Sequence, residues 1–400
     1  MPSAPFAFTT CPQRLRFNAD ALTDRICFCR KLLFMRHEGW EVFGRQQETP
    51  VLCIDLDRFE ANLQAMARVI SASGKQWRPH SKCHKSPEIA RRQINAGAIG
   101  VTCAKVSEAE VFAAAGVRDI LIAHLPVGAA RVQRISNLCK TADLITTCDH
   151  YAQAEPLAAA CRQLGVTCRI LIDINIGMNR TGITPGRDAL ELAQAVDKLT
   201  GLKLSGIMGY EGHAMPLMDD DAKSRLIRES LALLGESAEQ FRRSGLCADI
   251  VSAGGTGSLS YAIQSPGITE LQSGGGIFGD PFYTRMPGVS GYLPALTVLC
   301  TVVSRPSIDR AVLDAGRKAI TAELHSPVAK GFADAKVTMH SAEHIVLELG
   351  PDSRNLRIGD QIELIAGYAD FTTPLHDEFL CFRGDRLEAI WPIEARGKLP

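Results

Sequence analysis

The chain has 400 residues, of which 46% are hydrophobic and 22% are charged, so it can bury a sizeable core. Its 44 basic residues balance its 44 acidic residues. A formal charge of zero argues against nucleic acid or an anionic membrane as a partner, because both attract proteins with a strong basic field. The 13 cysteines do not have the spacing of a disulfide framework, and no secretory signal is recognisable. We therefore expect a cytoplasmic protein with reduced thiols.

Residues 1–47 come before the first regular pattern and are assigned to an N-terminal extension, for which packing on the C-terminal domain is one option. Residues 48–290 alternate short β-branched runs with amphipathic stretches. Ser107 to Glu110 has the pattern of a capping box at the start of one helix. In the first amphipathic stretch, apolar side chains recur at three- and four-residue spacing on one helix face: Phe59, Leu63, Met66 and Ile70.

Eight candidate strands, each followed by a helical stretch, predict an α/β fold of the (β/α)8 TIM-barrel type. A doubly wound open sheet has the same local pattern and stays as the alternative. The candidate strands are Trp77–His80, Gly100–Ala104, Ile120–Ala123, Leu144–Asp149, Arg169–Ile174, Leu204–Gly209, Asp249–Gly254 and Glu270–Gly274.

Residues 291–400 have a different pattern, in which helical periodicity is nearly absent and tight turns separate short strands. They predict a C-terminal all-β domain. The candidate strands are Thr297–Val303, Arg310–Leu313, Lys336–His340, His344–Leu349, Gln361–Ala366 and Glu378–Arg383.

Two segments at predicted strand ends carry side chains suited to chemistry, and in a barrel these ends form the functional rim. The first, Arg78 to Lys85, holds two lysines and two histidines, although surface charge is the simpler explanation for any one lysine. The second, Ser252 to Ser258, contains three glycines whose backbone N–H groups can converge on an anion, although glycine clusters also form plain turns. A rim lysine facing a phosphate-binding loop is the geometry for pyridoxal phosphate held as a Schiff base.

Several motifs in order resemble the D-threonine aldolase / D-serine dehydratase family, which consists of fold-type III pyridoxal phosphate enzymes related to alanine racemase. The branch of 3-hydroxy-D-aspartate aldolases is the most similar, and the resemblance extends from about Glu48 to Lys398. The motifs are Pro79–Lys85, Ile174–Gly182, Tyr210–His213, Ser252–Ser258, Glu270–Gln272, Asp314–Gly316, Glu343-His344 and Trp391–Gly397.

The resemblance implies a function for individual residues. Lys82 would form the Schiff base, Arg180 would face the cofactor ring and its phenolic oxygen, and Tyr210 would pack beside the ring. Without the resemblance, Arg180 could equally close a loop by a salt bridge, and Tyr210 could be a core aromatic residue. His80, His84 and the released Lys82 are the candidate bases. The phosphate would be bound by Ser252, Gly255, Thr256, Gly257 and Ser258.

The family's divalent metal site is altered in this chain. Relatives have a Gly-His-Cys-Asp-Pro-Thr segment, and the matching segment here runs from Gly367 to Thr372. Asp370 is retained as a hard ligand for Mg²⁺ or Mn²⁺, but Tyr368 replaces the histidine and Ala369 replaces the cysteine. A neutral phenol is a poor metal ligand near pH 7. We therefore expect most of the metal affinity to be lost, and a chelator to change the activity little.

The resemblance implies a lyase that cleaves D-configured β-hydroxy amino acids, of D-threonine or D-3-hydroxyaspartate type, to glycine and an aldehyde. Dehydration with loss of ammonia, racemisation and epimerisation are the alternatives, because Gly275 and Gly276 also replace larger residues near the substrate. A non-catalytic pyridoxal phosphate carrier and a barrel without cofactor are the other classes. The C-terminal domain favours an enzyme. By resemblance it would close the site from the partner subunit of a homodimer.

Overall fold

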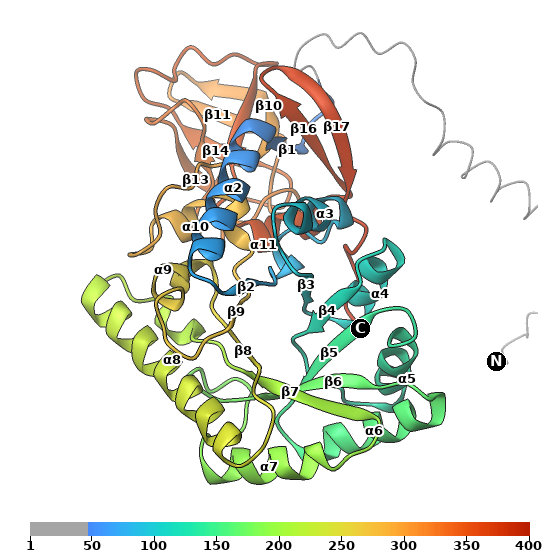
Figure 1. Cartoon of the computed structure of the whole chain (residues 1–400). Helices are drawn as coiled ribbons and strands as arrows, with labels where there is room; N and C mark the ends of the chain where they lie inside the picture. The colour runs from blue at the N-terminus through green and yellow to red at the C-terminus, as the bar shows by residue number, and fades with distance from the viewer. Residues whose placement is uncertain (1–46) are drawn as a thin grey trace, which may run out of the picture. The chain divides into compact units, whose positions relative to one another are not determined.

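The computed structural model describes residues 47–400, so the expectations for the N-terminal extension lie almost wholly outside the described residues. Within the described part, no helix is long and apolar enough to cross a membrane. The parallel strands of the N-terminal half and the antiparallel strands of the C-terminal half form two separate sheets (Figure 1).

All eight predicted barrel strands are present and parallel, in the order β2-β9-β8-β7-β6-β5-β4-β3. Backbone N–H groups of Ile99 and Thr102 bond to the carbonyls of Trp77 and Pro79 at 2.8 and 2.9 Å, which joins β3 to β2 and closes the sheet into a barrel. An open sheet is thereby excluded. The strands are β2 (Gln76–Trp77), β3 (Val101–Cys103), β4 (Asp119–Ile122), β5 (Asp143–Cys148), β6 (Cys168–Asp173), β7 (Leu202–Met208), β8 (Ile250–Ala253) and β9 (Glu270–Leu271).

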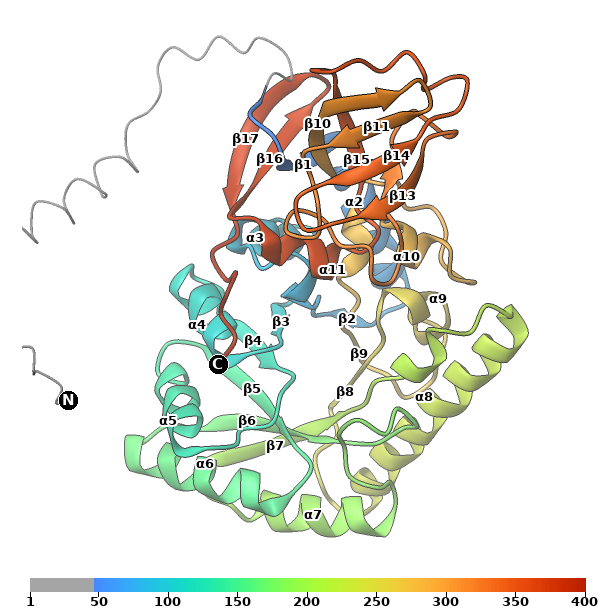
Figure 2. The same ribbon diagram turned by 180° about the vertical axis from the view of Figure 1, so that it is seen from behind.

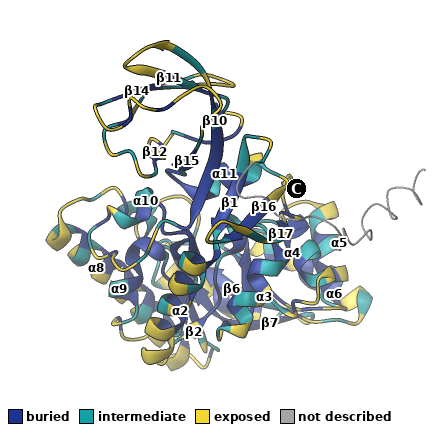
Figure 3. Cartoon of the chain, turned by 90° about the horizontal axis from the view of Figure 1, so that it is seen from above, coloured by how far each residue is buried: buried dark blue, intermediate teal, exposed yellow. Residues whose placement is uncertain are grey.

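Helices surround the barrel strands, and their inner faces are buried while their outer faces are exposed (Figure 3). The strands themselves are almost wholly buried, as apolar runs covered by helices must be. The helices are α3 (Pro87–Asn95), α4 (Val106–Ala114), α5 (Ala129–Leu138), α6 (Tyr151–Leu164), α7 (Arg187–Asp197), α8 (Asp220–Arg243) and α9 (Leu259–Ala262).

The predicted capping box at the start of α4 is only half right. Glu108 accepts hydrogen bonds from the backbone N–H groups of Ala104 and Lys105 at 2.8 and 3.0 Å, as the second half of a capping box does. The helix begins at Val106, however, with Lys105 at the N-cap, so Ser107 lies within the first turn and is not the capping residue.

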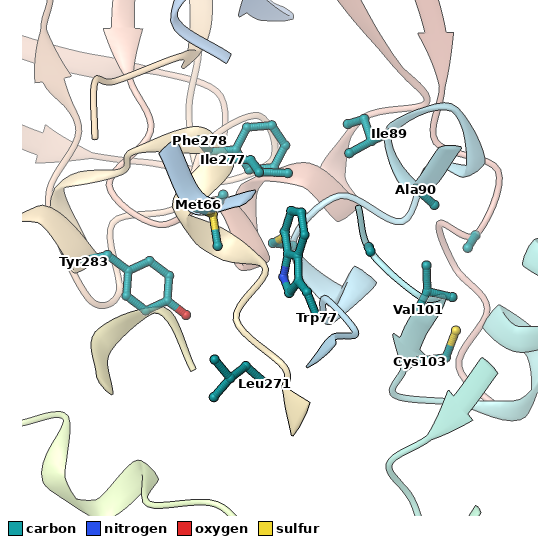
Figure 4. Close-up of a cluster of buried hydrophobic side chains, with 14 of the residues drawn as sticks. Met66, Trp77, Ile89, Ala90, Val101, Cys103, Leu271, Ile277, Phe278 and Tyr283 are labelled. Atoms are coloured by element: carbon teal, nitrogen blue, oxygen red, sulfur yellow. The ribbon is translucent and has the colours of Figure 1, made fainter. Parts of the chain in front are cut away.

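Helix α2 (Leu56–Ala72) packs between the two sheets, and all four apolar side chains predicted for its inner face are buried. Its Phe59 ring lies 6.3 Å from that of Phe278 and 5.6 Å from that of Trp391, which ends the C-terminal sheet. Its Met66 belongs to the buried cluster around Trp77, Leu271 and Phe278 (Figure 4). One apolar core therefore spans both halves of the described chain.

The second sheet confirms the predicted β domain and adds three strands that the pattern did not show. One is the two-residue strand β12 (Val328–Ala329), and another is β17 (Arg386–Pro392), the last strand of the chain. The third, β1 (Val51–Asp55), lies in the range assigned to the barrel. It pairs with β10 on one side and β16 on the other, so the second sheet takes a strand from before the barrel. The other strands are β10 (Leu296–Ser307), β11 (Arg310–Leu313), β12 (Val328–Ala329), β13 (Lys336–His340), β14 (Ile345–Glu348), β15 (Gln361–Ile365), β16 (Glu378–Arg383) and β17 (Arg386–Pro392).

Short helical turns follow several barrel strands, and two others, α10 (Pro281–Thr284) and α11 (Ala369–Thr372), lie between the two sheets (Figure 2). Asp280 holds two of them together, because its carboxylate accepts from the backbone N–H groups of Tyr283 and Ala369, both at 3.1 Å. Thr373 adds a bond of 2.8 Å from its hydroxyl to the Cys83 carbonyl. These turns are the 3-10 segments η1 (Ser81–Cys83), η2 (Gly212–Ala214), η3 (Thr256–Ser258), η4 (Gly275–Phe278) and η5 (Thr373–Leu375), with α10 (Pro281–Thr284) and α11 (Ala369–Thr372).

Candidate active site

The carboxyl ends of all eight barrel strands surround one cavity of about 470 Å³. This is the end of a parallel barrel at which loops can project functional groups over a rigid scaffold. Its walls combine apolar side chains and glycines with a limited set of polar groups, as is usual for a small-molecule site. The polar and charged side chains that line it are His80, Lys82, Lys105, His124, Thr147, Asp173, Arg180, Thr181, Tyr210, Thr256, Gln272 and Tyr283.

Lys82 lies at the cavity wall, in the η1 turn that follows β2. Its amino group is 2.7 Å from Asp370 Oδ2 and 3.4 Å from the Tyr368 hydroxyl, and that hydroxyl is 2.8 Å from the same carboxylate oxygen. Burial alone would lower the pKa of Lys82, but the Asp370 carboxylate outweighs it and holds the pKa above its ordinary value. In this state the amine is a protonated, paired group that faces the cavity.

Arg180 and Tyr210 lie next to each other on another wall of the cavity, and the contacts with a cofactor that the resemblance implies for them stay predictions. The Arg180 guanidinium carbon is 5.8 Å from the centre of the Tyr210 ring, which is cation–π distance. Among residues 47–400 no carboxylate forms an ion pair with Arg180, so the loop-closing salt bridge is not seen there. The side chain is exposed and its donors remain available to a ligand in the cavity.

Asp173 is a site residue that the sequence analysis missed. It ends β6, lines the cavity, is 6% exposed, and accepts a hydrogen bond of 2.8 Å from the Thr181 hydroxyl. This bond holds the end of the loop that carries Arg180. Burial raises the pKa of Asp173 to about 6, while the Thr181 hydrogen bond opposes the rise. Its position at a strand end was the signal that could have identified it.

The raised pKa predicts a measurable pH dependence of stability. The folded state binds the Asp173 proton more tightly than the unfolded state, whose pKa is near 4, so stability falls as the pH rises from 4 to 6. Two pKa units correspond to roughly 3 kcal/mol. We expect Asp173→Asn to gain about this free energy of unfolding relative to the wild type between pH 4 and pH 7. Urea denaturation of both proteins at each pH measures it, and parallel pH curves would contradict the assignment.

The glycine-rich loop after β8 forms part of the wall, through Gly254, Gly255 and Thr256. A Cβ atom on Gly255 would lie 3.2 Å from the Tyr210 ring, so a larger residue would push that ring. The Thr256 hydroxyl accepts from the Gly276 N–H at 3.1 Å and ties this loop to the second glycine-rich segment, at Gly274 to Gly276. Backbone groups can therefore approach a ligand closely here.

Of the five predicted phosphate contacts, Gly255 and Thr256 line the cavity and Ser252, Gly257 and Ser258 do not, so phosphate binding by this loop stays a prediction. The Ser252 hydroxyl donates to Glu270 at 2.7 Å and accepts from Gln272 at 2.9 Å. The Ser258 hydroxyl donates to the buried Glu211 and accepts from the Gly255 N–H at 3.0 Å. Both hydroxyls are fully buried and serve to shape the loop from behind.

Of the two candidate histidine bases, only His80 lines the cavity. Its Nδ1 accepts from the Lys82 N–H at 3.2 Å, and burial together with the charge of Lys82 holds its pKa well below the ordinary value. His84 is fully buried behind the turn, where its Nδ1 accepts from the Ser86 N–H at 3.0 Å. Burial lowers the pKa of His84 to about 3. His124 belongs to none of the motifs, yet it lines the cavity at the end of β4.

The surroundings of Asp370 do not fit a divalent ion. One oxygen of its carboxylate is bound by Lys82 and Tyr368, and Ala369 offers no side-chain ligand. Within the described residues, no group of three His, Cys, Asp or Glu side chains could hold a metal. Mg²⁺ and Mn²⁺ favour several oxygen or imidazole ligands in near-octahedral geometry, whereas this carboxylate is already neutralised by an ammonium.

The C-terminal domain of the same chain contributes side chains to this site, and closure by a partner subunit stays a prediction. Tyr368 and Asp370 reach Lys82 within one chain, and Tyr368 packs with its ring centre 4.5 Å from that of Phe282. The contact between Thr373 and Cys83 joins the same two domains. The homodimer itself stays a prediction.

The fold and the site together define a class of protein: a barrel of the alanine racemase type, followed by a β domain that places side chains at the rim lysine. A family model for the alanine racemase N-terminal domain matches residues 54–281, and a model for a serine dehydratase domain matches residues 295–382. The chain belongs to this alanine racemase-like family of enzymes, whose members depend in general on pyridoxal phosphate.

Individual relatives are similar over most of their length. A D-threonine aldolase from Arthrobacter sp. is 35% identical over 88% of this chain and 93% of its own. A 3-hydroxy-D-aspartate aldolase from Paracoccus denitrificans (strain Pd 1222) is 34% identical over 88% and 92%. The crystal structure of D-threonine aldolase from Filomicrobium marinum matches with a TM-score of 0.86 and 34% identity, covering 88% of this chain and 97% of that one. The resemblance expected from the sequence is thus confirmed.

Proposed function

We propose that this protein is a pyridoxal phosphate-dependent lyase that cleaves D-configured β-hydroxy amino acids to glycine and an aldehyde. The observation that carries the proposal is the amino group of Lys82, which faces the cavity. It contacts Asp370 and Tyr368, and the same cavity is lined by the two glycine-rich segments. The relatives named D-threonine aldolase and 3-hydroxy-D-aspartate aldolase support the reaction. Their identities differ by one percentage point, so both substrates belong to the proposal.

The residues present fit the cofactor. Lys82 supplies the primary amine, Arg180 supplies a cation beside Tyr210, and the backbone at Gly255 and Gly275 lines the part of the wall that would bind the phosphate. A Cβ atom on Gly275 would lie 2.7 Å from the Tyr283 ring, so only glycine fits at this position without moving that ring. When bound there, pyridoxal phosphate holds the amino group of the substrate and withdraws electrons from its Cα.

The side chains of this protein would then divide the remaining work. Arg180 and Tyr210 orient the flat ring, and the apolar wall at Met208 and Ala253 limits access of water. The amine of Lys82 would serve to move a proton at Cα of the substrate. His80, whose pKa is low, stays neutral near pH 7 and accepts the Lys82 N–H, which fixes the turn that carries the lysine.

Product analysis tests the proposed reaction. We expect purified protein with added pyridoxal phosphate to convert D-threonine or D-3-hydroxyaspartate to glycine and an aldehyde. Proton NMR measures both products. L-Threonine serves as the control and should remain unchanged. Ammonia and a keto acid in place of glycine would show the dehydratase reaction, which the match of residues 295–382 to a serine dehydratase domain favours as the second candidate. An inverted Cα without cleavage would show a racemase or epimerase.

A further inference from the structure

We propose that Asp370 and Tyr368 hold the β-hydroxyl group of the substrate and that Asp370 takes its proton, in a reaction that needs no divalent ion. This inference rests on the lyase function proposed above and assigns the residues that act on its β-hydroxyl group. The two residues come from the β domain, and Lys82 comes from the barrel.

The position now taken by the Lys82 amino group is a binding position for a hydrogen-bond donor. It lies 2.7 Å from Asp370 Oδ2 and 3.4 Å from the Tyr368 hydroxyl oxygen. When Lys82 is engaged elsewhere, Oδ2 loses its ammonium partner but keeps the Tyr368 hydroxyl at 2.8 Å. A hydroxyl group that enters the same position can donate to Oδ2, as the ammonium did, and contact the Tyr368 oxygen at the same time.

Burial and packing hold Asp370 and Tyr368 in place, as residues that act on a substrate must be held. Asp370 is 7% exposed, and its second oxygen, Oδ1, is buried without a hydrogen-bond partner among the described residues. The Tyr368 ring packs against three aromatic rings, with centre-to-centre distances of 4.5 Å to Phe282, 5.8 Å to Tyr283 and 5.0 Å to Phe371. Asp280 fixes the start of α11 through the Ala369 N–H.

The proton and electron balance of the cleavage is complete with these groups. The β-hydroxyl proton moves to Asp370, the C–O bond becomes a carbonyl, and the Cα–Cβ bond breaks with its electron pair left at Cα. The aldehyde departs, and Cα then takes a proton, delivered by Lys82. Asp370 returns its proton to the solvent or to Lys82, so the net change is one proton moved from oxygen to Cα. No oxidant, reductant or metal is required.

A comparison of two reactions tests the assignment of Asp370. Cleavage of a β-hydroxy substrate needs the proposed base, whereas exchange of the glycine α-proton with D₂O needs only the cofactor and Lys82. We expect Asp370→Asn to lower kcat for cleavage by about 10²–10³-fold, the usual contribution of a positioned base, while glycine exchange stays within a few-fold of the wild type. Asp377→Asn, which alters an exposed carboxylate in the next turn, should change neither reaction.

Equal losses of cleavage and exchange in Asp370→Asn would overturn the assignment, because Asp370 would then act only by holding Lys82. Tyr368→Phe should lower kcat for cleavage about five- to tenfold with little change in exchange, since it removes one neutral hydrogen bond. The matched control is Tyr151→Phe, which removes a hydroxyl from an exposed tyrosine on α6.

Metal binding is measured directly by electron paramagnetic resonance during titration with Mn²⁺. We expect the wild type to bind no Mn²⁺ at micromolar concentration and to keep its cleavage rate after dialysis against EDTA. Tyr368→His should gain Mn²⁺ binding, because it adds an imidazole next to Asp370. Loss of wild-type cleavage on chelation, with recovery on addition of Mn²⁺, would overturn the inference. Absence of glycine from every D-β-hydroxy substrate would instead refute the proposed function, and the Mn²⁺ titration would still report on the site.

Discussion

Replacing Lys82 by alanine is expected to remove the absorption band that added pyridoxal phosphate gives when it is bound through a lysine, and to lower turnover by at least about 10³-fold. The cause lies in the site itself, because Lys82 is the amine that faces the cavity, where it contacts Asp370 and Tyr368. Absorption spectroscopy of the purified variant and the NMR product assay measure the two effects separately.

The second lysine of the cavity supplies the matched control. Lys105 also lines the wall, at the N-cap of α4, but it has no carboxylate partner among the ion pairs of the described residues. We expect Lys105→Ala to keep the absorption band and most of the turnover. If the band survives in Lys82→Ala and disappears in Lys105→Ala, the lysine that binds the cofactor is Lys105 and the proposed assignment to Lys82 is wrong. The cofactor ring would then have a different orientation.

The barrel could be predicted from sequence because each of its strands is an isolated apolar run between amphipathic stretches. β1 could not be found in this way, because Val51–Asp55 runs directly into helix α2 and its partners, β10 and β16, lie more than 240 residues away along the chain. Pairing over such distances depends on the tertiary fold and leaves no local pattern.

The backbone conformation decides which residues of a motif face the cavity, and the sequence alone does not show it. Lys82 and His84 are two residues apart in a turn with about three residues per turn, so their side chains point to different sides. Only Lys82 reaches the cavity. Ser252 and Ser258 flank the glycines in sequence, yet their hydroxyls donate to two different buried carboxylates, those of Glu270 and Glu211. Conversely, Asp173 and His124 have no motif but stand at strand ends, where the barrel geometry alone places side chains at the rim.

The largest effect on stability is expected at Arg78, which shares the carboxylate of Glu270 with Ser252. This side chain is 1% exposed and donates to Glu270 at 2.9 Å and to Asp119 at 2.6 Å. Glu270 also accepts from Ser252 in β8, so the ion pair connects the end of β2 and strand β9 to strand β8. Burial lowers the pKa of Arg78, but the two carboxylates outweigh it and raise the pKa above its ordinary value.

Arg78→Met is expected to lower the free energy of unfolding by about 3–5 kcal/mol, because it leaves the Glu270 carboxylate buried without a counter-charge. The measurement is urea denaturation of the wild type and the variant at pH 7. The double variant Arg78→Met with Glu270→Gln should recover part of the loss, since no unpaired charge is then buried. Arg383, which pairs with Asp57, Glu60 and Glu388 on the surface, is the control: Arg383→Met should cost far less although it breaks more ion pairs. Similar losses for the two arginines would mean that burial does not set the strength of the Arg78 interaction, and that the barrel tolerates an isolated charge beside its active-site loop.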